Sequence, residues 1–462
     1  MNNNGVNDKA NIKVTGHDNR AAIQILDGSV YRTINAEFIS ETQDVFSKYE
    51  SNARVKKLVV KTELHSKNQN ELVLQHELLK ISYPCEWTPA MLVDAALHTL
   101  ELSDVLHEDR LVLKDFLPSN LLYDGMEWRF IDFCSIIREE SLLSEDWIPH
   151  NETIERSKRS ILLVMFIPFI LIPILVGING STHRMAKLLK NNYCNSGLWS
   201  PGWRNLFFSR ISKNYFRNLN ILRKTKKLIR KTDIDEINNE IRKLLTELRR
   251  KVPKSAYSEY YEEKNANSAI QDKTGWNEKQ RSIDSILDDK RPKLLFDIGA
   301  NTGWYSNLGL KYGSLVYALD NDCASLDIAY RNTYQNGLIP FHLDFDDIWE
   351  RANPISTSFI ERHCANMVLA LGLVHHLVLG KGEPIEVVMQ KLSELTKEYL
   401  VVEFVDLSDE KIQNEPSFFK LLKMMSTDYS EEAFITQGLR YFNSVKKLPS
   451  SPGTRTILFF SR

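Results

Sequence analysis

The stretch LLFDIGANTG, at Leu294–Gly303, decides the fold of the second half of this chain. Its apolar start is typical of a parallel strand that is covered on both faces. Gly299 and Gly303 follow, and they let the backbone turn tightly and approach a ligand without a Cβ in the way. Asp297 has the wrong charge for a pyrophosphate, and no Lys-Ser or Lys-Thr pair follows as in a P-loop. The stretch therefore predicts a strand, a turn and a helix beside a cationic or hydroxyl-rich ligand.

Further strand-like runs downstream extend the predicted sheet. They lie at 314–320, 339–344, 366–371, 399–406 and 456–460, with Pro452-Gly453-Thr454-Arg455 before the last one. Asp320 comes 23 residues after Asp297, close to the spacing of a carboxylate that accepts ribose hydroxyls across one βαβ step. Asn321 or Asp322 are alternatives beside it. Strands that alternate with helical stretches predict a doubly wound, Rossmann-like α/β sheet over 256–462, closed by a hairpin.

These motifs resemble those of class I S-adenosylmethionine (SAM) methyltransferases. The resemblance implies SAM as cofactor and assigns each matching residue a place around it. Asp297, Gly299, Asn301 and Gly303 would line the methionine end, Asp320 the ribose and Asp344 the adenine side, with His375 and His376 toward the acceptor. Asn366 stands where many members carry an acid, which argues against acid-assisted transfer to nitrogen. The alternatives are a Rossmann-like domain for another nucleotide and a sheet that has lost its ligand.

Methyl transfer itself asks little of side chains, because the sulfonium is already activated. The enzyme has to align nucleophile, methyl carbon and sulfur and to exclude water. A hydroxyl acceptor also needs a base to take its proton. His375 and His376 follow the fourth predicted strand, where ligands of open α/β sheets collect, and either is suited to that task, with His376 preferred. Glu403, inside the fifth strand, is either a pocket acid or a structural residue.

The first half of the chain carries a second pattern. LKDFLPSNLLY at Leu113–Tyr123, a hairpin and then Ile131-Asp132-Phe133 resemble the catalytic and metal-binding loops of kinase-like folds. In such a site Asp115 would orient an acceptor hydroxyl, while Asn120 and Asp132 would hold magnesium. Lys114 and Cys134 depart from the family pattern, and no glycine-rich phosphate loop precedes them. We therefore expect a degenerate α+β kinase-like domain over 21–150. Lys61 is a weak candidate for the lysine that pairs with phosphate, and Glu77 for its partner.

Four segments taken together narrow the resemblance further. They are ISYPCEWTPAML at Ile81–Leu92, LKDFLPSNLLYDG at Leu113–Gly125, LVHHLV at Leu373–Val378 and VVEFV at Val401–Val405. As a set they resemble a bacterial group of methyltransferases related to a rhizobial host-specific nodulation protein. This resemblance implies O-methylation of a small molecule or of a saccharide or glycan. A bifunctional kinase–methyltransferase and a non-catalytic SAM- or nucleotide-binding scaffold are the alternatives.

Composition favours a cytoplasmic enzyme. The 462 residues carry a formal net charge of −1, so no overall field attracts nucleic acid. The five cysteines are scattered without the spacing of metal ligands, and no metal site is predicted. Residues 1–20 are polar and lack an apolar signal core, which indicates a disordered tail. The sequence leaves the oligomeric state open.

The segment 151–255 is predicted as a helical connector with an apolar stretch. Ile161–Ile178 is an uncharged run of 18 residues, at the lower limit for spanning a bilayer. Pro168 and Pro173 interrupt it, and a single span would separate the two halves across a membrane. A buried helix or an interfacial contact is therefore favoured. The basic stretch 213–231 and the amphipathic helix predicted from Thr232 suit either a peripheral membrane contact or a solvated face.

Overall fold

The computed structural model describes residues 12–14, 19–145, 153–194, 231, 233–251, 255, 270, 273–351, 356–419 and 429–462. The chain divides into two compact units. One comprises Met1–Pro84 and Leu92–Lys251, and the other comprises Cys85–Met91 and Val252–Arg462. The predicted disordered tail at 1–20 is wrong where the structure describes it, because Ile12–Val14 pair with strand β2 (Ala21–Leu26) and Arg20 forms ion pairs with Glu41 and Glu145. The rest of this tail and almost all of the basic stretch at 213–231 lie outside the described residues.

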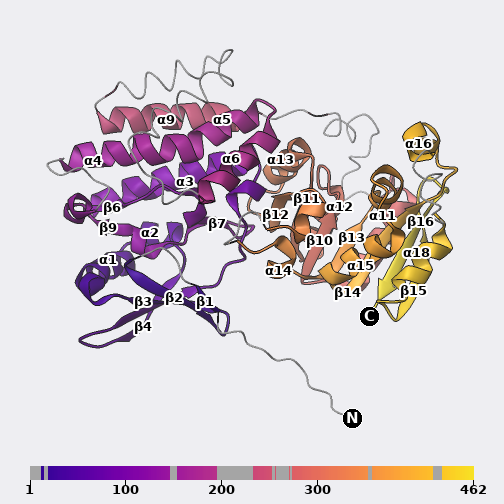
Figure 1. The fold of residues 1–462 in the computed structure, drawn as a ribbon, viewed down its shortest axis with the longest axis horizontal. Coiled ribbons are helices and arrows are strands. Elements are labelled where there is room, and N and C mark those ends of the chain that lie inside the picture. The colour runs from indigo at the N-terminus through magenta and orange to yellow at the C-terminus, as the bar shows by residue number, and fades with distance from the viewer. Residues whose placement is uncertain are drawn as a thin grey trace, which may run out of the picture. The chain divides into compact units, whose positions relative to one another are not determined.

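The first unit contains a five-stranded antiparallel sheet in the order β1-β2-β3-β5-β4 (Figure 1). Its strands are β1 (Ile12–Val14), β2 (Ala21–Leu26), β3 (Ser29–Ile34), β4 (Thr62–Lys67) and β5 (Leu72–Glu77), with helices α1 (Ile39–Ser51) and α2 (Ala53–Leu58) between β3 and β4. A long helix and short strands follow, namely α3 (Pro89–Glu108), β6 (Leu111–Leu113), β7 (Leu121–Tyr123), β8 (Trp128–Phe130) and β9 (Ile136–Arg138). β6 pairs with β9 and β7 pairs with β8. These two small hairpin-like ladders hold the loops that carry Asp115 and Asp132.

The apolar stretch of the first unit is helical. It runs through α4 (Ile154–Ile161), a π-helical segment (Leu162–Leu171) and α5 (Ile172–Ile178), and α6 (Thr182–Cys194) and α9 (Ile234–Arg249) lie beside it. This helix is long and apolar enough to cross a membrane, yet 76% of its most apolar window is buried inside the structure. Such burial is what the favoured reading as a core helix requires. The interfacial contact stays a prediction.

The second unit is built on a seven-stranded sheet in the order β12-β11-β10-β13-β14-β16-β15. Its strands are β10 (Leu294–Ile298), β11 (Leu315–Asp320), β12 (Leu338–His342), β13 (Ala365–Ala370), β14 (Thr396–Val405), β15 (Ser444–Pro449) and β16 (Arg455–Ser461). The first five run parallel, and β16 joins β14 and β15 in antiparallel pairing. The predicted mixed α/β sheet and its closing hairpin are therefore confirmed.

Helices of the second unit cover the sheet (Figure 1). They are α11 (Glu278–Lys290), α12 (Trp304–Lys311), α13 (Cys323–Asn332), α14 (Phe359–Arg362), α15 (Ile385–Leu395), α16 (Glu410–Gln413) and α18 (Glu431–Gly438). α12 and α13 pack on β10–β12, whereas α15 packs on β13 and β14. The middle strands are almost fully buried, which is why they read as continuous apolar runs.

The edge strand β15 has a different character from the buried strands. Its sequence SVKKLP is largely exposed and carries two lysines, which discourages pairing with another sheet edge. A polar strand of this kind has no apolar pattern, so the sequence revealed the hairpin only through its buried partner β16.

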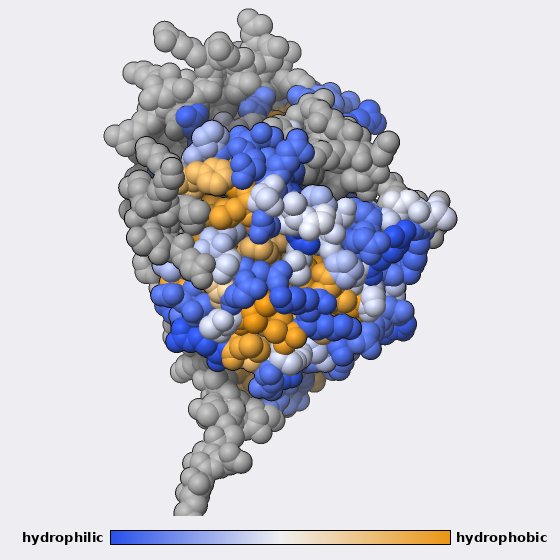
Figure 2. Space-filling view, turned by 90° about the vertical axis from the view of Figure 1, so that its right-hand side faces the viewer, coloured by the Kyte–Doolittle hydropathy of each residue, from blue (hydrophilic) through white to orange (hydrophobic). Residues whose placement is uncertain are grey.

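On the face presented in Figure 2, apolar side chains occur as small groups separated by charged and polar ones, as on an ordinary solvated surface.

Candidate functional site

The turn after β10 depends on left-handed backbone at three positions. Gly299, Asn301 and Gly303 have φ angles of 77°, 52° and 81°. A Cβ on Gly303 would lie 3.1 Å from the Cβ of Ala329 in α13, so both conformation and space favour glycine there. α12 begins directly after Gly303. The predicted strand, turn and helix are confirmed, and the helix N-terminus faces the end of the strand.

Asp297 lies at the end of β10 and is 2% exposed. Its Oδ2 accepts a 2.7 Å hydrogen bond from the Ser306 hydroxyl in α12. Burial raises the pKa of Asp297 to about 6, and the nearby Asp320 acts in the same direction. A buried carboxylate with a raised pKa is typical of a ligand site, because a cationic ligand would restore its ionised form.

Asp320 ends the neighbouring strand β11, beside the same turn. Its two oxygens accept hydrogen bonds from the backbone N–H groups of Asn301, at 2.7 Å, and Asp322, at 2.8 Å. Burial raises the pKa of Asp320 to about 6, although these backbone donors oppose the shift. β10 and β11 are parallel neighbours, with Ile298 opposite Leu319. The structure therefore brings both predicted acids to the same edge of the sheet.

Asp344 lies two residues beyond β12 instead of at its end, because the strand stops at His342. Asp344 contacts Asn321, whose Nδ2 is 3.4 Å from Oδ2, and it forms an ion pair with Lys381. Burial would raise the pKa of Asp344, but the hydrogen bond and charge of Lys381, the backbone N–H of Asp346 and the Asn321 amide together lower it. Asp344 thus lies near Asn321, the residue that follows Asp320, and Lys381 balances its charge.

His375 and His376 lie in the segment that follows β13, with ring centroids 4.1 Å apart. His375 is buried, and its Nδ1 has no hydrogen-bond partner in the described part of the chain. Burial, and then the His376 charge, lower the pKa of His375 to about 2. The His376 pKa is lowered as well, mainly by burial, although part of this residue reaches solvent. Both imidazoles are therefore neutral at physiological pH, and burial makes His375 hard to protonate.

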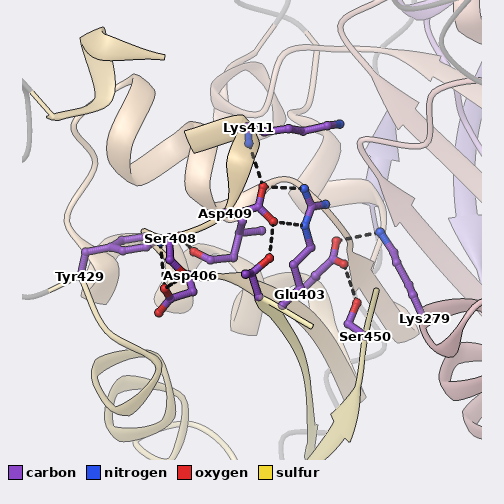
Figure 3. Close-up of polar contacts among 11 residues, drawn as sticks. Lys279, Glu403, Asp406, Ser408, Asp409, Lys411, Tyr429 and Ser450 are labelled. Carbon is purple, nitrogen blue, oxygen red and sulfur yellow. Dashed lines mark hydrogen bonds and ion pairs between the residues drawn. The ribbon is translucent and has the colours of Figure 1, made fainter. Parts of the chain in front are cut away.

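Glu403 is fully buried in β14 and belongs to a network that sequence reasoning did not find. Lys279 of α11 donates a 2.7 Å hydrogen bond to one of its oxygens, and the Ser450 hydroxyl donates a 2.8 Å bond to the other (Figure 3). Lys279 follows the helix-capping residue Asn277, and nothing in that local sequence points to β14. The pairing arises only when the sheet brings α11 and β14 together.

A second network holds the loop after β14. Asp409 is 1% exposed and accepts hydrogen bonds from the Arg455 guanidinium at 2.8 and 3.0 Å and from the Thr454 hydroxyl at 2.8 Å (Figure 3). Tyr429 donates to the Val405 carbonyl oxygen at 2.9 Å. These contacts join the loop to β16, and Phe418 on the same loop lies 5.8 Å from the His376 ring. The loop therefore forms one wall beside the two histidines.

The first unit also brings its predicted acids together. The Ser135 hydroxyl contacts Asp115 at 2.9 Å and Asp132 at 2.5 Å. Arg32, on β3, forms a 2.7 Å ion pair with Asp132, and Asn120 donates to the remaining oxygen of Asp115. Burial, together with repulsion from Asp132, raises the pKa of Asp115. Arg32 was missed by sequence analysis, because its strand lies 100 residues before Asp132.

The other predicted residues of that unit do not join this cluster. Lys61 is 70% exposed and pairs with Glu63, while the backbone N–H of Glu77 donates to the Lys61 carbonyl oxygen and the Glu77 charge contributes to raising the pKa of Lys61. Within the described ranges, no group of three or more His, Cys, Asp or Glu side chains is arranged to hold a metal ion. The role of the first unit stays a prediction.

Comparison with known proteins gives one relative across most of the chain. The chain is 25% identical over 424 residues to the nodulation protein NoeA of Rhizobium meliloti strain 1021, covering 84% of this chain and 82% of that protein. No protein-family model matches the chain. The predicted resemblance to a rhizobial nodulation protein is therefore supported at modest identity.

Solved structures give weaker likenesses, limited to less than half of this chain. The bifunctional kinase–methyltransferase WbdD matches at 13% identity with a TM-score of 0.31, over 44% of this chain and 42% of that one. The magnesium protoporphyrin IX methyltransferase ChlM of Synechocystis PCC 6803, solved with bound S-adenosylhomocysteine, matches at 16% identity with a TM-score of 0.29, over 44% of this chain and 97% of that one. Because these TM-scores are low, the proposed cofactor site rests on the strand order and on the geometry of the residues described above.

Proposed function

We propose that the second unit binds SAM at the carboxyl edge of its parallel strands and transfers the methyl group to a hydroxyl of a small molecule or saccharide. The observation that carries this proposal is the pair of aspartates at the ends of β10 and β11, on either side of the left-handed turn, of which Asp297 is buried and Asp320 is partly buried. Asp297 suits the cationic methionine end, and Asp320 suits ribose hydroxyls, which donate to a carboxylate.

When bound, SAM supplies an activated methyl group on a sulfonium. The residues of this chain then have three tasks. The Gly299–Gly303 turn lets the backbone approach the ligand, Asp297 and Asp320 fix its orientation, and the wall formed by Phe418 excludes water beside the histidines. Asp344, near Asn321, is proposed to lie on the adenine side. Each task concerns alignment more than chemistry.

The two histidines are assigned to the acceptor. A hydroxyl must lose its proton as it attacks the methyl carbon, and a neutral imidazole is able to take it. His376 is the proposed base, because it is exposed whereas His375 is buried, and burial lowers the pKa of His375 so far that it would be an inefficient base. The buried Nδ1 of His375 would accept a hydrogen bond from the acceptor and so orient it.

The saccharide acceptor is an analogy that rests on the resemblance to nodulation proteins, and the name of the relative specifies no acceptor. A bifunctional kinase–methyltransferase is disfavoured, because the four carboxylate oxygens of Asp115 and Asp132 are engaged by Asn120, Ser135 and Arg32. A cytoplasmic location, without a nucleic-acid partner, stays a prediction.

The cofactor assignment is tested by calorimetric titration of the full chain with SAM. We expect micromolar binding by the wild type and a loss of roughly 10- to 100-fold in Asp320→Asn, because hydrogen bonds to a charged group contribute about 1.5–3 kcal/mol. Asp288→Asn is the matched control, since Asp288 is an exposed acid of α11 paired with Arg291. Absence of binding by well-folded wild-type protein would contradict the proposal.

The proposed base is tested once an acceptor has been found by screening hydroxylated saccharides with radiolabelled SAM. His376→Gln should lower kcat about 100-fold or more, while the affinity for SAM stays within about twofold, because general-base catalysis contributes roughly 10²–10⁴-fold. Equal turnover by the variant and the wild type would show that His376 is not the general base.

A further inference from the structure

The Lys279–Glu403 ion pair lies inside the second unit and is sparsely exposed. The side chains of Lys279 and Glu403 are 14% and 0% exposed, and their charged atoms are 2.7 Å apart. Figure 3 shows Lys279 and Ser450 reaching Glu403 from different elements. Removing two charges from water is costly, and a buried pair is weak evidence for a gain in stability. Stability alone therefore does not explain why Lys279 and Glu403 are charged, and the ion pair is a candidate for a functional role.

The ammonium group of Lys279 lies beside the predicted methionine end of the cofactor site. It is 5.2 Å from the centroid of the Tyr305 ring, and Tyr305 is the second residue of α12, directly after the glycine turn. Trp276, just before α11, packs on Trp304 with ring centroids 5.4 Å apart. These aromatic contacts fix the start of α11 against the start of α12.

The opposite side of the ion pair borders the site as well. A Cβ on Gly372, the second residue after β13, would lie 3.6 Å from Oε2 of Glu403, the oxygen that accepts from Lys279. Burial raises the pKa of Asp297, whereas the charge of Lys279 acts to lower it. The lysine is thus close enough to the ends of β10 and β13 to act on both.

The charges around the turn are incomplete for a zwitterionic ligand. Asp297, Asp320 and Glu403 suit a sulfonium or an α-ammonium group, but they would repel the α-carboxylate of the same methionine moiety. Among the groups that shift the Asp297 pKa, Lys279 is the one that carries positive charge. An ammonium group has three N–H donors, and the bond to Glu403 uses one of them.

We propose that Lys279 binds the α-carboxylate of the cofactor, with Glu403 and Ser450 as positioning residues that hold its ammonium group toward the turn. The inference rests on the proposed function, because it assigns one more contact in the same site. The ion pair and the amino-acid end of the ligand then form a complementary set in which cations and anions alternate.

The test compares SAM with decarboxylated SAM, which keeps the sulfonium, the amine and the adenosine but lacks the carboxylate. In calorimetric titrations the wild type should bind SAM at least tenfold more tightly. Lys279→Gln should lose at least tenfold in affinity for SAM and less than twofold for the decarboxylated ligand. Lys279→Arg should keep the preference for SAM, because it keeps the cation.

A second variant controls for the possibility that Lys279→Gln loses affinity because it is misfolded. Lys279→Gln leaves Glu403 buried without its cation, so the double variant Lys279→Gln/Glu403→Gln removes both charges together. Circular dichroism should show that it is folded, and it should bind the two ligands with nearly equal affinity. A double variant that still prefers SAM as the wild type does would overturn the role of Lys279. A folded wild type that binds neither ligand would instead overturn the cofactor proposal itself.

Discussion

Each unit contains a pair of neighbouring aspartates that are buried or partly buried, and the donors around the two pairs differ. In the first unit, Asp132 faces the guanidinium of Arg32, and Ser135 bridges it to Asp115. In the second unit, the direct donors to Asp297 and Asp320 are a serine hydroxyl and backbone N–H groups. One pair is neutralised by a cation of the protein, whereas the other receives neutral donors.

This difference appears in the pKa values. Burial acts to raise the pKa of Asp132, but the charge and hydrogen bond of Arg32, the Ser135 hydroxyl and the charge of Lys114 together lower it. Burial raises the pKa of Asp320 to about 6, and backbone donors only moderate the shift. A carboxylate already satisfied by a guanidinium has little to gain from an incoming cation. The comparison therefore predicts a structural role for Asp132 and a ligand-binding role for Asp320, while Asp115, whose pKa burial and Asp132 raise, is held by Asn120 and Ser135.

The largest effect is expected from breaking the ion pair of the first unit. Arg32→Met leaves the Asp132 carboxylate, whose side chain is only 19% exposed, without its cation, and loss of one partner of a buried pair costs about 3–5 kcal/mol. Urea denaturation followed by circular dichroism would measure it. Arg54→Met is the matched control, because the Arg54–Glu108 pair is about 60% exposed and such pairs contribute about 1 kcal/mol or less. Equal effects of the two substitutions would contradict a structural role for Arg32.

A smaller effect is expected at the turn of the second unit. Gly303→Ala places a methyl group at φ 81° and 3.1 Å from Ala329, so the turn should shift and SAM affinity should fall by roughly tenfold or more. Gly313→Ala has nearly the same φ, 83°, but no atom lies within 4 Å of its Cβ. Calorimetry should show little change for this control. Similar losses in both variants would indicate a general effect of backbone strain.

The pH dependence of binding provides a third test. Burial raises the pKa values of Asp297 and Asp320 to about 6, and the proposed binding mode uses their ionised forms. SAM affinity should therefore be full above pH 7 and fall as pH decreases through 6, by about tenfold at pH 5 for each carboxylate that must ionise. Asp320→Asn should flatten this profile. A flat wild-type profile between pH 5 and 8 would show that neither ionisation matters.

The smallest effect is expected when magnesium and ATP are added to the full chain. A ligand that binds the folded state raises the midpoint of thermal unfolding. Because Asp132 is already paired with Arg32, we expect magnesium and ATP at millimolar concentration to raise this midpoint by less than about 1 °C. Differential scanning fluorimetry would detect a larger change. A rise of several degrees that is lost in Asp132→Asn would restore the kinase-like alternative.

Local sequence was sufficient for the central part of the second unit. The run LLFDIGANTG predicted β10, the left-handed turn and the start of α12, because apolar strands and glycine turns are properties of neighbouring residues. The acids at the strand ends were predicted for the same reason, since parallel strands carry their ends to one edge. The third strand was predicted to end at Asp344, but it ends two residues earlier, at His342. The end of a strand depends on its pairing with a neighbour, which the local sequence does not show.

What only the tertiary structure decided is which charges meet. Lys279 and Glu403 are 124 residues apart, and Arg32 and Asp132 are 100 apart, so no local pattern connects either pair. The exposed strand β15 and the loop contacts of Asp409 were hidden for the same reason. The sequence by itself determined the sheet and the acids at its edge, because periodicity and turn chemistry act over a few residues. The partners of those acids were determined by packing, because an ion pair depends on distance in space and not along the chain.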